Sequence, residues 1–302
     1  MKSNTSPAPD AAVAGVRLTH PERLLYPQAG LTKLDLARYA QDMAAWILPH
    51  IERRPLTLVR CPQGADHACF FQKHAQETLP DGIERIAVPD AKQAQTWYMM
   101  ANSSAALVGL VQISALEWHT WGASAPRLEQ PDRIIFDLDP APDVPWSDTV
   151  ASARLLRELL RRCGMQSYVK TTGGKGLHLV LPIVPEHGWE AVRAWSRAVA
   201  ERVEARWPER FVSDMSKSKR DGRIFIDYLR NAIEATAVAP YSPRAKPHAP
   251  VSTPLAWEEL DASLHPDSLT VLTVRQRMAK RREDPWSGYF TLDQRLDPDR
   301  MP

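Results

Sequence analysis

The sequence predicts an α/β (α+β) fold in which an antiparallel-rich sheet is backed by helices. Three short apolar runs, rich in β-branched and aromatic residues, predict buried strands at 133–140, 177–184 and 223–229. Two longer segments carry apolar residues at helical spacing, at 147–162 and 188–207. Strands and helices in this order favour one sheet with the two helices packed against it.

The composition limits the possible functions. The chain of 302 residues is one large domain or two small ones, and a hydrophobic content of 44% is enough for a sizeable core. The formal net charge of +2 does not make the protein basic, so any affinity for nucleic acid must come from local patches. No apolar stretch approaches the roughly 20 residues of a membrane span, and the N-terminus lacks a signal-peptide pattern. We therefore expect no contact with a membrane.

The three cysteines, Cys61, Cys69 and Cys163, include no C-x-x-C pair. Their odd number makes a disulfide framework unexpected and fits a reducing compartment. Cys61 and Cys69 form a loose cluster with His67 and His74, but the spacing matches no common zinc module. A zinc site is therefore the less favoured interpretation of this cluster.

The N-terminal half contains a tail and several short elements. Residues 1–15 are small, polar and rich in Pro and Ala, which predicts a disordered tail or a linker. A helix is expected to begin at Thr32, where Asp35 completes a capping arrangement, and its apolar stripe continues to Ile47. Further along we expect a strand at 54–60, an extended segment at 69–74, a buried helix at 103–117 and a strand at 118–121.

Two adjacent aromatic residues stand out in the extended segment. Phe70 and Phe71 face opposite sides of an extended chain, so one ring can enter the core while the other remains for a partner. An exposed Phe beside Lys73 and His74 is typical of a site that stacks on a base next to a phosphate. The equally open alternative is that both rings lie in the core.

In the C-terminal half, Ser147 is expected to cap the helix at 147–162, and Gly164 to follow its end. The other expected elements are strands at 167–171 and 236–241, a short helical start at 257–260 and a helix at 268–280. The chain then becomes polar and loses its periodicity, so we expect 286–302 to form a C-terminal tail, with Asp284, Pro285 and Trp286 able to hold its start against the body.

Two aspartates in the predicted strand RIIFDLDP carry the first chemical signal. Side chains alternate along a strand, so Asp137 and Asp139 lie on one face about 7 Å apart and would repel each other unless a cation compensates them. Asp227 ends another predicted strand, and three carboxylates from two strands can hold two divalent ions. Two such ions, Mn²⁺ or Mg²⁺, are the apparatus of in-line nucleotidyl transfer.

A glycine-rich loop, TGGKG at 172–176, joins two of the predicted strands. Its backbone N–H groups can approach a phosphate closely and Lys175 adds a positive charge, although the loop is not a Walker A motif. Further groups are expected around the same phosphates: His178, Arg230, Arg244 and the MSKSKR run that includes Lys217. The alternatives are a tight hairpin, a structural histidine and a solvated charged surface.

Taken in order, these motifs resemble those of the archaeo-eukaryotic primase superfamily. More closely, the chain resembles the polymerase domain of bacterial ATP-dependent DNA ligase D, which acts in Ku-dependent non-homologous end joining. The pieces that carry the resemblance are LTHPERLLYP, GLTK, FFQKH, ALEWH, IIFDLDP, TTGGKGLHLVLP, MSKSKRDGRIFIDYLRN and APYSPR. The resemblance implies a primase-polymerase domain at 16–285, with an interleaved N-terminal α/β lobe at 16–125 and an RRM-like catalytic palm at 126–285.

The resemblance also implies an activity and its partners. It implies a DNA/RNA polymerase with terminal transferase activity, which adds nucleotides, preferably ribonucleotides, to 3′ ends at gaps and double-strand breaks. The partners would be DNA ends with a 5′-phosphate, NTPs or dNTPs, Ku and a DNA ligase, fused or separate, in the bacterial cytoplasm near the nucleoid. The chain shows neither a ligase nucleotidyl-lysine motif nor the zinc element of replicative primases.

Site residues are implied in the same way. Asp137, Asp139 and Asp227 would bind two catalytic metal ions, usually manganese. The incoming nucleotide would contact His119, Thr172, Gly174, Lys175, His178, Lys217, Arg230 and Arg244. The DNA would contact His20, Arg23, Lys33, Phe70, Phe71 and Lys73. In this set, Arg23 and Lys33 match the family's pocket for the 5′-phosphate of the downstream strand.

Three other functions remain open. A stand-alone primase would start chains de novo, and initiation on an unprimed single strand would distinguish it. A glycosyltransferase can also use D-x-D with Mn²⁺, but it does not need a third strand aspartate together with TGGKGLH. A non-catalytic module that binds DNA ends would have little reason to keep three carboxylates, which repel DNA unless metal is bound.

Overall fold

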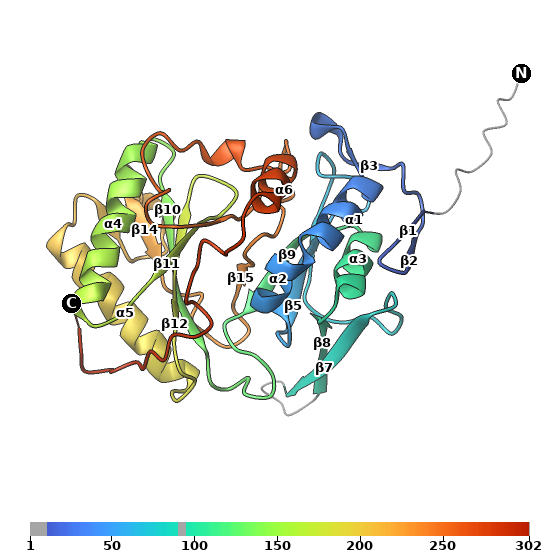
Figure 1. Cartoon of the computed structure of the whole chain (residues 1–302). Helices are drawn as coiled ribbons and strands as arrows, with labels where there is room; N and C mark the ends of the chain where they lie inside the picture. The colour runs from blue at the N-terminus through green and yellow to red at the C-terminus, as the bar shows by residue number, and fades with distance from the viewer. Residues whose placement is uncertain (1–10, 90–94, 302) are drawn as a thin grey trace, which may run out of the picture.

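The computed structural model describes residues 11–89 and 95–301 and shows two α/β halves side by side (Figure 1). One half contains the sheet that carries the aspartates, together with α4 and α5. The other contains the second sheet, together with α1, α2 and α3. Residues 1–10 of the predicted N-terminal tail lie outside the described residues.

The first sheet, which we call the palm sheet, has six strands in the order β13-β14-β10-β12-β11-β16. Its members are β10 (Arg133–Pro140), β11 (Tyr168–Thr171), β12 (Leu177–Pro182), β13 (Phe211–Val212), β14 (Ile224–Asp227) and β16 (Pro254–Leu255). Neighbouring strands are antiparallel except β13 with β14. Along its outer side lie α4 (Trp146–Arg162) and α5 (Trp189–Arg206) (Figure 1). The predicted antiparallel-rich sheet backed by two helices is confirmed.

Strand β10 gives the palm sheet one apolar and one polar face. Ile134, Phe136 and Leu138 are fully buried, and the ring of Phe136 packs against Trp195 of α5. Each large apolar side chain buried in this way contributes about 1.5–3 kcal/mol. A slip of one residue would turn these side chains away from the helices, so their burial fixes the register that leaves the alternate residues on the opposite face.

The second sheet, which we call the N-lobe sheet, has the order β15-β9-β5-β8-β7, with β6 also paired to β5. Its members are β5 (Leu56–Arg60), β6 (Phe70–Gln72), β7 (Ile83–Pro89), β8 (Gln95–Ala101), β9 (Ala115–Trp121) and β15 (Thr236–Val238). Strand β15 follows the palm strand β14 in sequence but pairs with β9. The two lobes are therefore interleaved. Four helices complete the fold: α1 (Lys33–Asp42), α2 (Ala44–Ile51), α3 (Ser104–Gln112) and α6 (Val271–Ala279).

The helix starts were only partly predicted. The Thr32 side chain accepts from the Asp35 N–H, and Asp35 accepts from the Thr32 N–H, so the capping arrangement of α1 is confirmed. The apolar stripe that continues to Ile47 belongs to a second helix, α2, instead of extending the first. Pro145 occupies the N-cap position of α4, so Ser147 is not the cap.

The helix ends show a second difference. The buried helix expected at 103–117 ends at Gln112, because Ser114 has a left-handed φ of 59° and the chain then enters β9. Gly164 follows α4 with a φ of 78°, as predicted. A turn occupies 257–260, where a short helix was expected.

Both ends of the described chain pack against the body, which corrects the two predicted tails but confirms the expected contact of Trp286. Residues 11–18 form a hairpin of two strands, β1 (Ala11–Val13) and β2 (Val16–Leu18). In the segment 286–302, Trp286 is only 2% exposed and its Nε1 donates to the carbonyl of Val169 at 2.8 Å. Trp286 and Tyr289 are buried individually, so this segment has no helix or strand period that a sequence pattern could reveal.

A disulfide joins Cys61 to Cys69, contrary to expectation. Strands β5 and β6 are antiparallel neighbours with Arg60 opposite Phe70, so the cysteine after one strand meets the cysteine before the other. With three cysteines, at least one must remain unpaired, but one disulfide between the other two is still possible. The unpaired cysteine is Cys163, which is buried. The disulfide also removes both thiolates from the loose zinc cluster.

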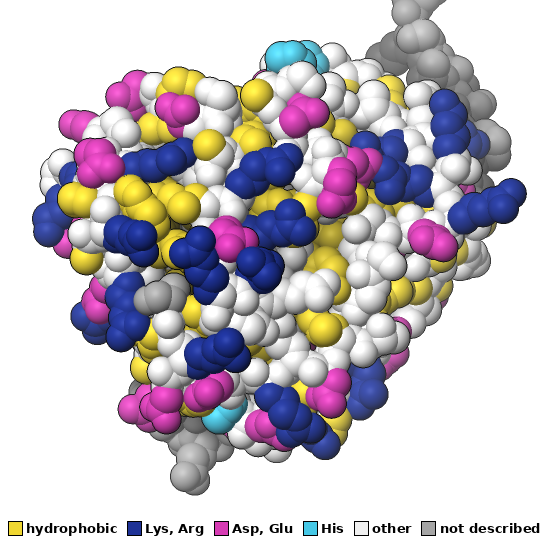
Figure 2. All heavy atoms as spheres, turned by 60° about the vertical axis from the view of Figure 1, so that its left-hand side comes forward, with side chains coloured by type: hydrophobic (Ala, Val, Ile, Leu, Met, Phe, Trp, Pro, Cys, Tyr) yellow, Lys and Arg dark blue, Asp and Glu magenta, His cyan; other side chains and the backbone are white. Residues whose placement is uncertain are grey.

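The outer face over α4 carries charges of both signs. Figure 2, turned so that this side comes forward, shows Lys and Arg side chains interspersed with Asp and Glu and with small hydrophobic areas. On α4 itself, Arg161 and Arg162 both pair with Glu158. Within the described ranges, no helix has the length and apolar character to cross a membrane.

Candidate active site

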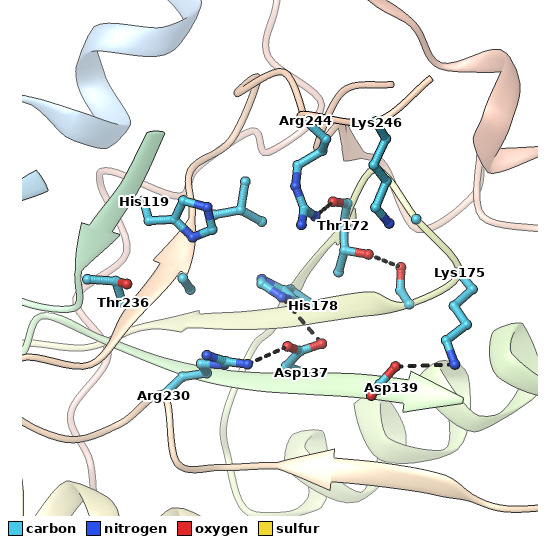
Figure 3. Close-up of a pocket in the computed structure, with 14 residues that line it drawn as sticks. His119, Asp137, Asp139, Thr172, Lys175, His178, Arg230, Thr236, Arg244 and Lys246 are labelled. Atoms are coloured by element: carbon cyan, nitrogen blue, oxygen red, sulfur yellow. Dashed lines mark hydrogen bonds and ion pairs between the residues drawn. The ribbon is translucent and has the colours of Figure 1, made fainter. Parts of the chain in front are cut away.

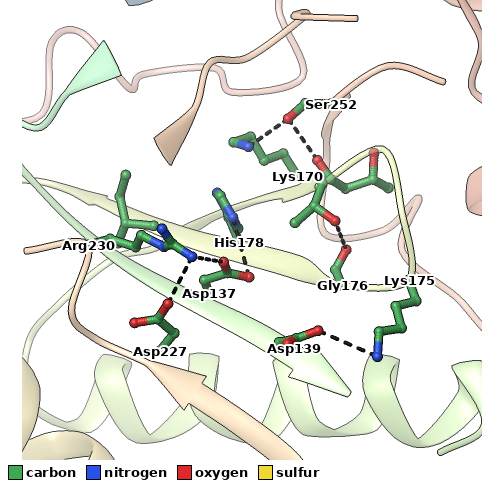
Figure 4. A network of polar contacts seen from close by, with 12 residues as sticks. Asp137, Asp139, Lys170, Lys175, Gly176, His178, Asp227, Arg230 and Ser252 are labelled. Carbon is green, nitrogen blue, oxygen red and sulfur yellow. Dashed lines mark hydrogen bonds and ion pairs between the residues drawn. The ribbon is translucent and has the colours of Figure 1, made fainter. Parts of the chain in front are cut away.

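Four polar side chains form a row across the palm sheet. Asp227 on β14 lies opposite Asp137 on β10. On the other side of Asp137, the row continues through His178 on β12 to Lys170 on β11. Directly opposed residues of antiparallel strands point to the same face. Figure 4 shows these side chains together on the polar face, with Asp139 nearby.

Two of the aspartates share one arginine. A terminal nitrogen of Arg230 lies 3.0 Å from Oδ2 of Asp227 and 3.6 Å from Oδ2 of Asp137. On its other side, Oδ1 of Asp137 is 3.4 Å from Nε2 of His178. A positive charge therefore lies between two carboxylates that would otherwise repel each other.

The third carboxylate, Asp139, is more exposed and contacts two cations. Its oxygens lie 3.2 Å from Arg220 and 3.6 Å from Nζ of Lys175. The Arg220 guanidinium stacks 3.9 Å from the centre of the Phe225 ring, and Lys175 also donates to the carbonyl of Pro140. The glycine loop and the MSKSKR run thus both reach the end of β10.

Burial and neighbouring charges act in opposite directions on these groups. Burial would raise the pKa of Asp137, but His178, Arg230 and Lys170 lower it to about 2. The pKa of Asp227 is raised, because burial and the charge of Asp137 outweigh the effect of Arg230. Burial and the charge of Lys170 lower the pKa of His178 to about 4, so its imidazole is neutral at pH 7.

The glycine loop at 172–176 joins β11 to β12, as predicted. It closes as a tight turn, with the Thr172 N–H and hydroxyl both donating to the carbonyl of Gly176. Gly173 has a φ of 69°, a conformation that favours glycine. A Cβ at Gly176 would lie 2.6 Å from the carbonyl oxygen of Leu138, so only glycine lets the loop lie this close to β10.

A pocket of about 270 Å³ opens above the aspartates (Figure 3). Both lobes line it, and the predicted residues on its wall are His119, Asp137, Asp139, Thr172, Gly174, Lys175, His178, Arg230 and Arg244. Asp227 adjoins it through Arg230. Lys217 is not on the pocket wall, because it is exposed on the short 3₁₀ helix η2 (Lys217–Lys219). From the same MSKSKR run, Arg220 reaches the site and pairs with Asp139.

The predicted stacking pair lies on β6. Phe70 is 47% exposed and Phe71 is 71% exposed, so neither ring enters the core and both alternatives that buried a ring are wrong. The two rings point to opposite faces of β6, a short strand that pairs with β5, and both side chains remain exposed. The Phe71 ring approaches His119 edge-on at 6.2 Å, Arg60 lies over Phe70, and the neighbouring Lys73 is exposed.

The residues predicted for the 5′-phosphate lie near the start of α1. His20 is exposed, whereas Lys33 is buried and its Nζ donates to the carbonyls of Thr19 at 3.0 Å and Gln112 at 3.2 Å. Burial and the nearby charge of Arg23 lower the pKa of Lys33 to about 8. The structure thus brings Arg23 and Lys33 together, with the ammonium group of Lys33 held by backbone carbonyls.

Three charged residues at the site were missed from the sequence. Glu117 contacts His119 and Arg244 of the pocket wall. The sequence feature that could have indicated it is a single charged residue in an apolar run. Lys170 is buried and its Nζ donates to Oγ of Ser252 at 2.6 Å, and a lysine in a predicted strand was its signal. Lys246 lines the pocket from a segment without periodicity, where no signal was available.

In the described structure, Lys and Arg side chains of the chain itself offset the negative charge of the three aspartates. In the ranges 11–89 and 95–301, no group of three or more His, Cys, Asp or Glu side chains is arranged to hold a metal ion. The guanidinium of Arg230 nevertheless lies between the carboxylates of Asp137 and Asp227, where their negative charges attract a cation. Carboxylate oxygens are the ligands that Mg²⁺ and Mn²⁺ prefer. The chemistry of this donor set therefore suits divalent ions, which would occupy the place of Arg230 between the two carboxylates.

Known proteins of one family are similar to this chain along most of its length. A family model described as the LigD primase-polymerase domain matches residues 32–286. "Multifunctional non-homologous end joining protein LigD" of Pseudomonas aeruginosa is 39% identical over 287 residues, which covers 95% of this chain and 34% of that protein. "Bifunctional non-homologous end joining protein LigD" of Bacillus subtilis is 28% identical over 267 residues, 88% of this chain and 43% of that protein. The chain therefore spans less than half the length of these relatives.

A solved structure shares the fold. The polymerase domain from Mycobacterium tuberculosis Ligase D in complex with DNA matches with a TM-score of 0.81 and 33% sequence identity. The match covers 87% of this chain and 94% of that chain. It confirms the predicted mixed α/β polymerase fold.

Proposed function

The chain belongs to the LigD primase-polymerase family of nucleotidyltransferases, and from that premise we propose that it adds nucleotides to the 3′ ends of DNA in non-homologous end joining. Its substrates would be NTPs or dNTPs, preferably ribonucleotides, and DNA ends at gaps and double-strand breaks. The observation that carries this proposal is the meeting of three strand aspartates and a set of cations at one pocket between two lobes. Family membership leaves no support for the glycosyltransferase alternative.

Asp137, Asp139 and Asp227 are proposed to hold two divalent ions, Mn²⁺ or Mg²⁺. When bound, the ions would activate the attacking 3′-hydroxyl and neutralise the triphosphate and its leaving group. His178 is neutral at pH 7, so its Nε2–H can donate to Asp137 and orient that carboxylate. Arg230 would then be released from its pairing with the carboxylates and could contact the substrate.

The nucleotide would lie along the pocket wall. The backbone N–H groups of the loop at 172–176, together with Lys175, Arg244 and Lys246, offer donors and positive charge for the triphosphate. His119 and Phe71 flank the other end of the pocket, where the base and sugar would lie. In this assignment the phosphates contact the palm sheet and the base contacts the N-lobe sheet.

The DNA would be bound by the N-terminal lobe. The exposed rings of Phe70 and Phe71 would stack on bases, and Lys73 would contact the backbone. Arg23, Lys33 and His20 would bind the 5′-phosphate of the downstream strand. Since Lys33 is held by two backbone carbonyls, its amine would exchange one of them for the phosphate.

Partners are proposed from the relatives. Those proteins are named as multifunctional or bifunctional end-joining proteins, and this chain spans 34% of the Pseudomonas relative. Ku and a DNA ligase, fused or separate, are therefore the proposed partners. Repair of chromosomal ends would take place in the bacterial cytoplasm, near the nucleoid.

Primer extension on a gapped duplex tests the proposal. The duplex carries a downstream 5′-phosphate, and ribonucleotides are compared with deoxyribonucleotides in Mn²⁺ and in Mg²⁺. The wild type should extend the primer with a preference for ribonucleotides. Asp137→Ala and Asp139→Ala should abolish extension, whereas Asp143→Ala, which removes an exposed carboxylate outside the pocket, should not.

Each other outcome has a defined meaning. Extension that is unaffected by removal of the 5′-phosphate would leave a polymerase but reject the roles of Arg23 and Lys33. Efficient initiation on an unprimed single strand would favour a primase. Failure of the folded wild type to extend with either metal would overturn the proposed function.

A further inference from the structure

Glu117 is a buried carboxylate behind the pocket, and only 6% of it is exposed. Its Oε2 accepts from Nε2 of His119 at 2.8 Å and forms an ion pair with Nε of Arg244 at 2.9 Å. Its Oε1 accepts from the backbone N–H of Ala245 at 2.9 Å. Two of these partners are side chains on the pocket wall, so one carboxylate contacts both.

Through Glu117, the two lobes are tied together at the site. Glu117 lies on β9 of the N-lobe sheet, whereas Arg244 lies after β15 and donates from its guanidinium to the carbonyl of Thr172. A Cβ at Gly173 would lie 2.5 Å from Cγ of Arg244, so the arginine packs directly on the glycine loop. Arg244 is therefore held between Glu117 and the loop proposed to bind phosphates.

The same carboxylate defines which nitrogen of His119 carries the proton. An ionised carboxylate can only accept, so the hydrogen bond places the imidazole proton on Nε2. Burial lowers the pKa of His119, which keeps the ring neutral. Its Nδ1 then has a free lone pair, and within the described residues this atom has no hydrogen-bond partner. The ring itself lines the pocket (Figure 3).

The partners of Glu117 stabilise its ionised carboxylate. Burial would raise its pKa, but the hydrogen bond from His119 and the charge of Arg244 lower it to about 2. A buried charge is retained at low cost only where its partners are in place. Loss of the carboxylate would leave the Arg244 guanidinium and the His119 imidazole free to turn.

We infer that Glu117 is a positioning residue for the incoming nucleotide: it aims Arg244 at the phosphate loop and fixes His119 in the tautomer that presents Nδ1 to the pocket as an acceptor. The inference rests on the proposed function, because the nucleotide is the ligand that the two side chains would meet. Glu117 itself does not line the pocket and would not touch the substrate.

Two measurements test the inference. The first is ¹⁵N NMR of the histidine rings in protein without Mn²⁺, which distinguishes the two neutral tautomers. Wild-type His119 should show the Nε2–H form, and Glu117→Gln should show a mixture. The second is steady-state primer extension, in which Glu117→Gln should raise the KM for the nucleotide by about tenfold or more, while kcat at saturating nucleotide changes much less.

Asp132→Asn is the matched control. Asp132 is a half-buried carboxylate that is also paired with an arginine, Arg54, but it lies outside the pocket. It should lower stability without changing the nucleotide KM or the tautomer of His119. Equal rises in KM for both variants would show a merely structural role and overturn the inference.

The wild-type NMR spectrum is decisive even if Glu117→Gln does not fold. An Nδ1–H tautomer or a charged imidazole at His119 at pH 7 would overturn the inference. An unchanged nucleotide KM in folded Glu117→Gln would do the same, while wild-type extension would leave the proposed function intact. The NMR measurement requires no turnover, so it tests Glu117 separately from the polymerase activity.

Discussion

Replacing Gly176, which lies on the pocket wall, by alanine should displace the neighbouring aspartates. The added Cβ would lie 2.6 Å from the carbonyl oxygen of Leu138, whereas real Cβ atoms essentially never come closer than 3.0 Å. The obstructing atom belongs to the backbone of β10 and cannot rotate away, so the strand or the loop must shift. Leu138 lies between Asp137 and Asp139, so a shift of its carbonyl moves both carboxylates. Overpacking of this kind costs about 1–3 kcal/mol of folding free energy.

The larger effect is expected on catalysis. Misplacement of reacting groups by about 1 Å can cost roughly 10²-fold in rate. A smaller shift should lower kcat of primer extension by about tenfold or more, while thermal unfolding changes by only a few degrees. Gly188→Ala is the control, because its Cβ would meet nothing closer than the carbonyl oxygen of Glu129 at 3.8 Å. A Gly176→Ala protein with wild-type kcat and wild-type stability would refute the reasoning.

Three buried features give further tests. Arg54→Met leaves the half-buried carboxylate of Asp132 without its ion pair and should lower the free energy of unfolding in urea by about 1–3 kcal/mol; an unchanged midpoint would contradict this. The pKa of His178 is lowered from 6.5 to about 4, so the unfolded chain binds the proton first and stability should fall as pH drops from 6.5 toward 4. His178→Gln should weaken that dependence, and a slope identical to wild type would argue against it. The Cys61–Cys69 bridge predicts a single free thiol in denatured, unreduced protein, and its reduction should cost about 2 kcal/mol of stability; a titration that finds three thiols would show that the bridge is absent.

Local pattern was enough to predict the strand and the glycine loop that form the floor of the candidate site. The alternation in 133–140 separates apolar from acidic residues, and the glycines at 172–176 indicate a turn between two strands. Both signals depend on neighbours within a few residues. The sequence could predict that Asp137 and Asp227 come close together, but not that they lie directly opposite each other. The register between distant strands depends on packing across the whole sheet.

Features that depend on long-range contacts were missed. The run at 103–117 is apolar enough for either a helix or a strand, and only the left-handed Ser114 divides it. With the segment assigned to a helix, Glu117 could not be placed beside Arg244, which lies far along the chain. The contact of Trp286 with the body was expected, but its partner, a carbonyl of β11, is one that no local pattern indicates.

The position of β15 limits how the domain can be divided. Its three residues, Thr236–Val238, are supplied by the C-terminal half of the chain, yet they cover the edge of β9 beside His119. A fragment cut between the lobes near residue 125 would lose that strand and expose an unpaired edge, which is a common start of aggregation. The matching palm fragment would carry β15 with nothing to pair to. Any attempt to graft this polymerase onto another protein, or to express its lobes separately, must therefore keep both sheets in one piece.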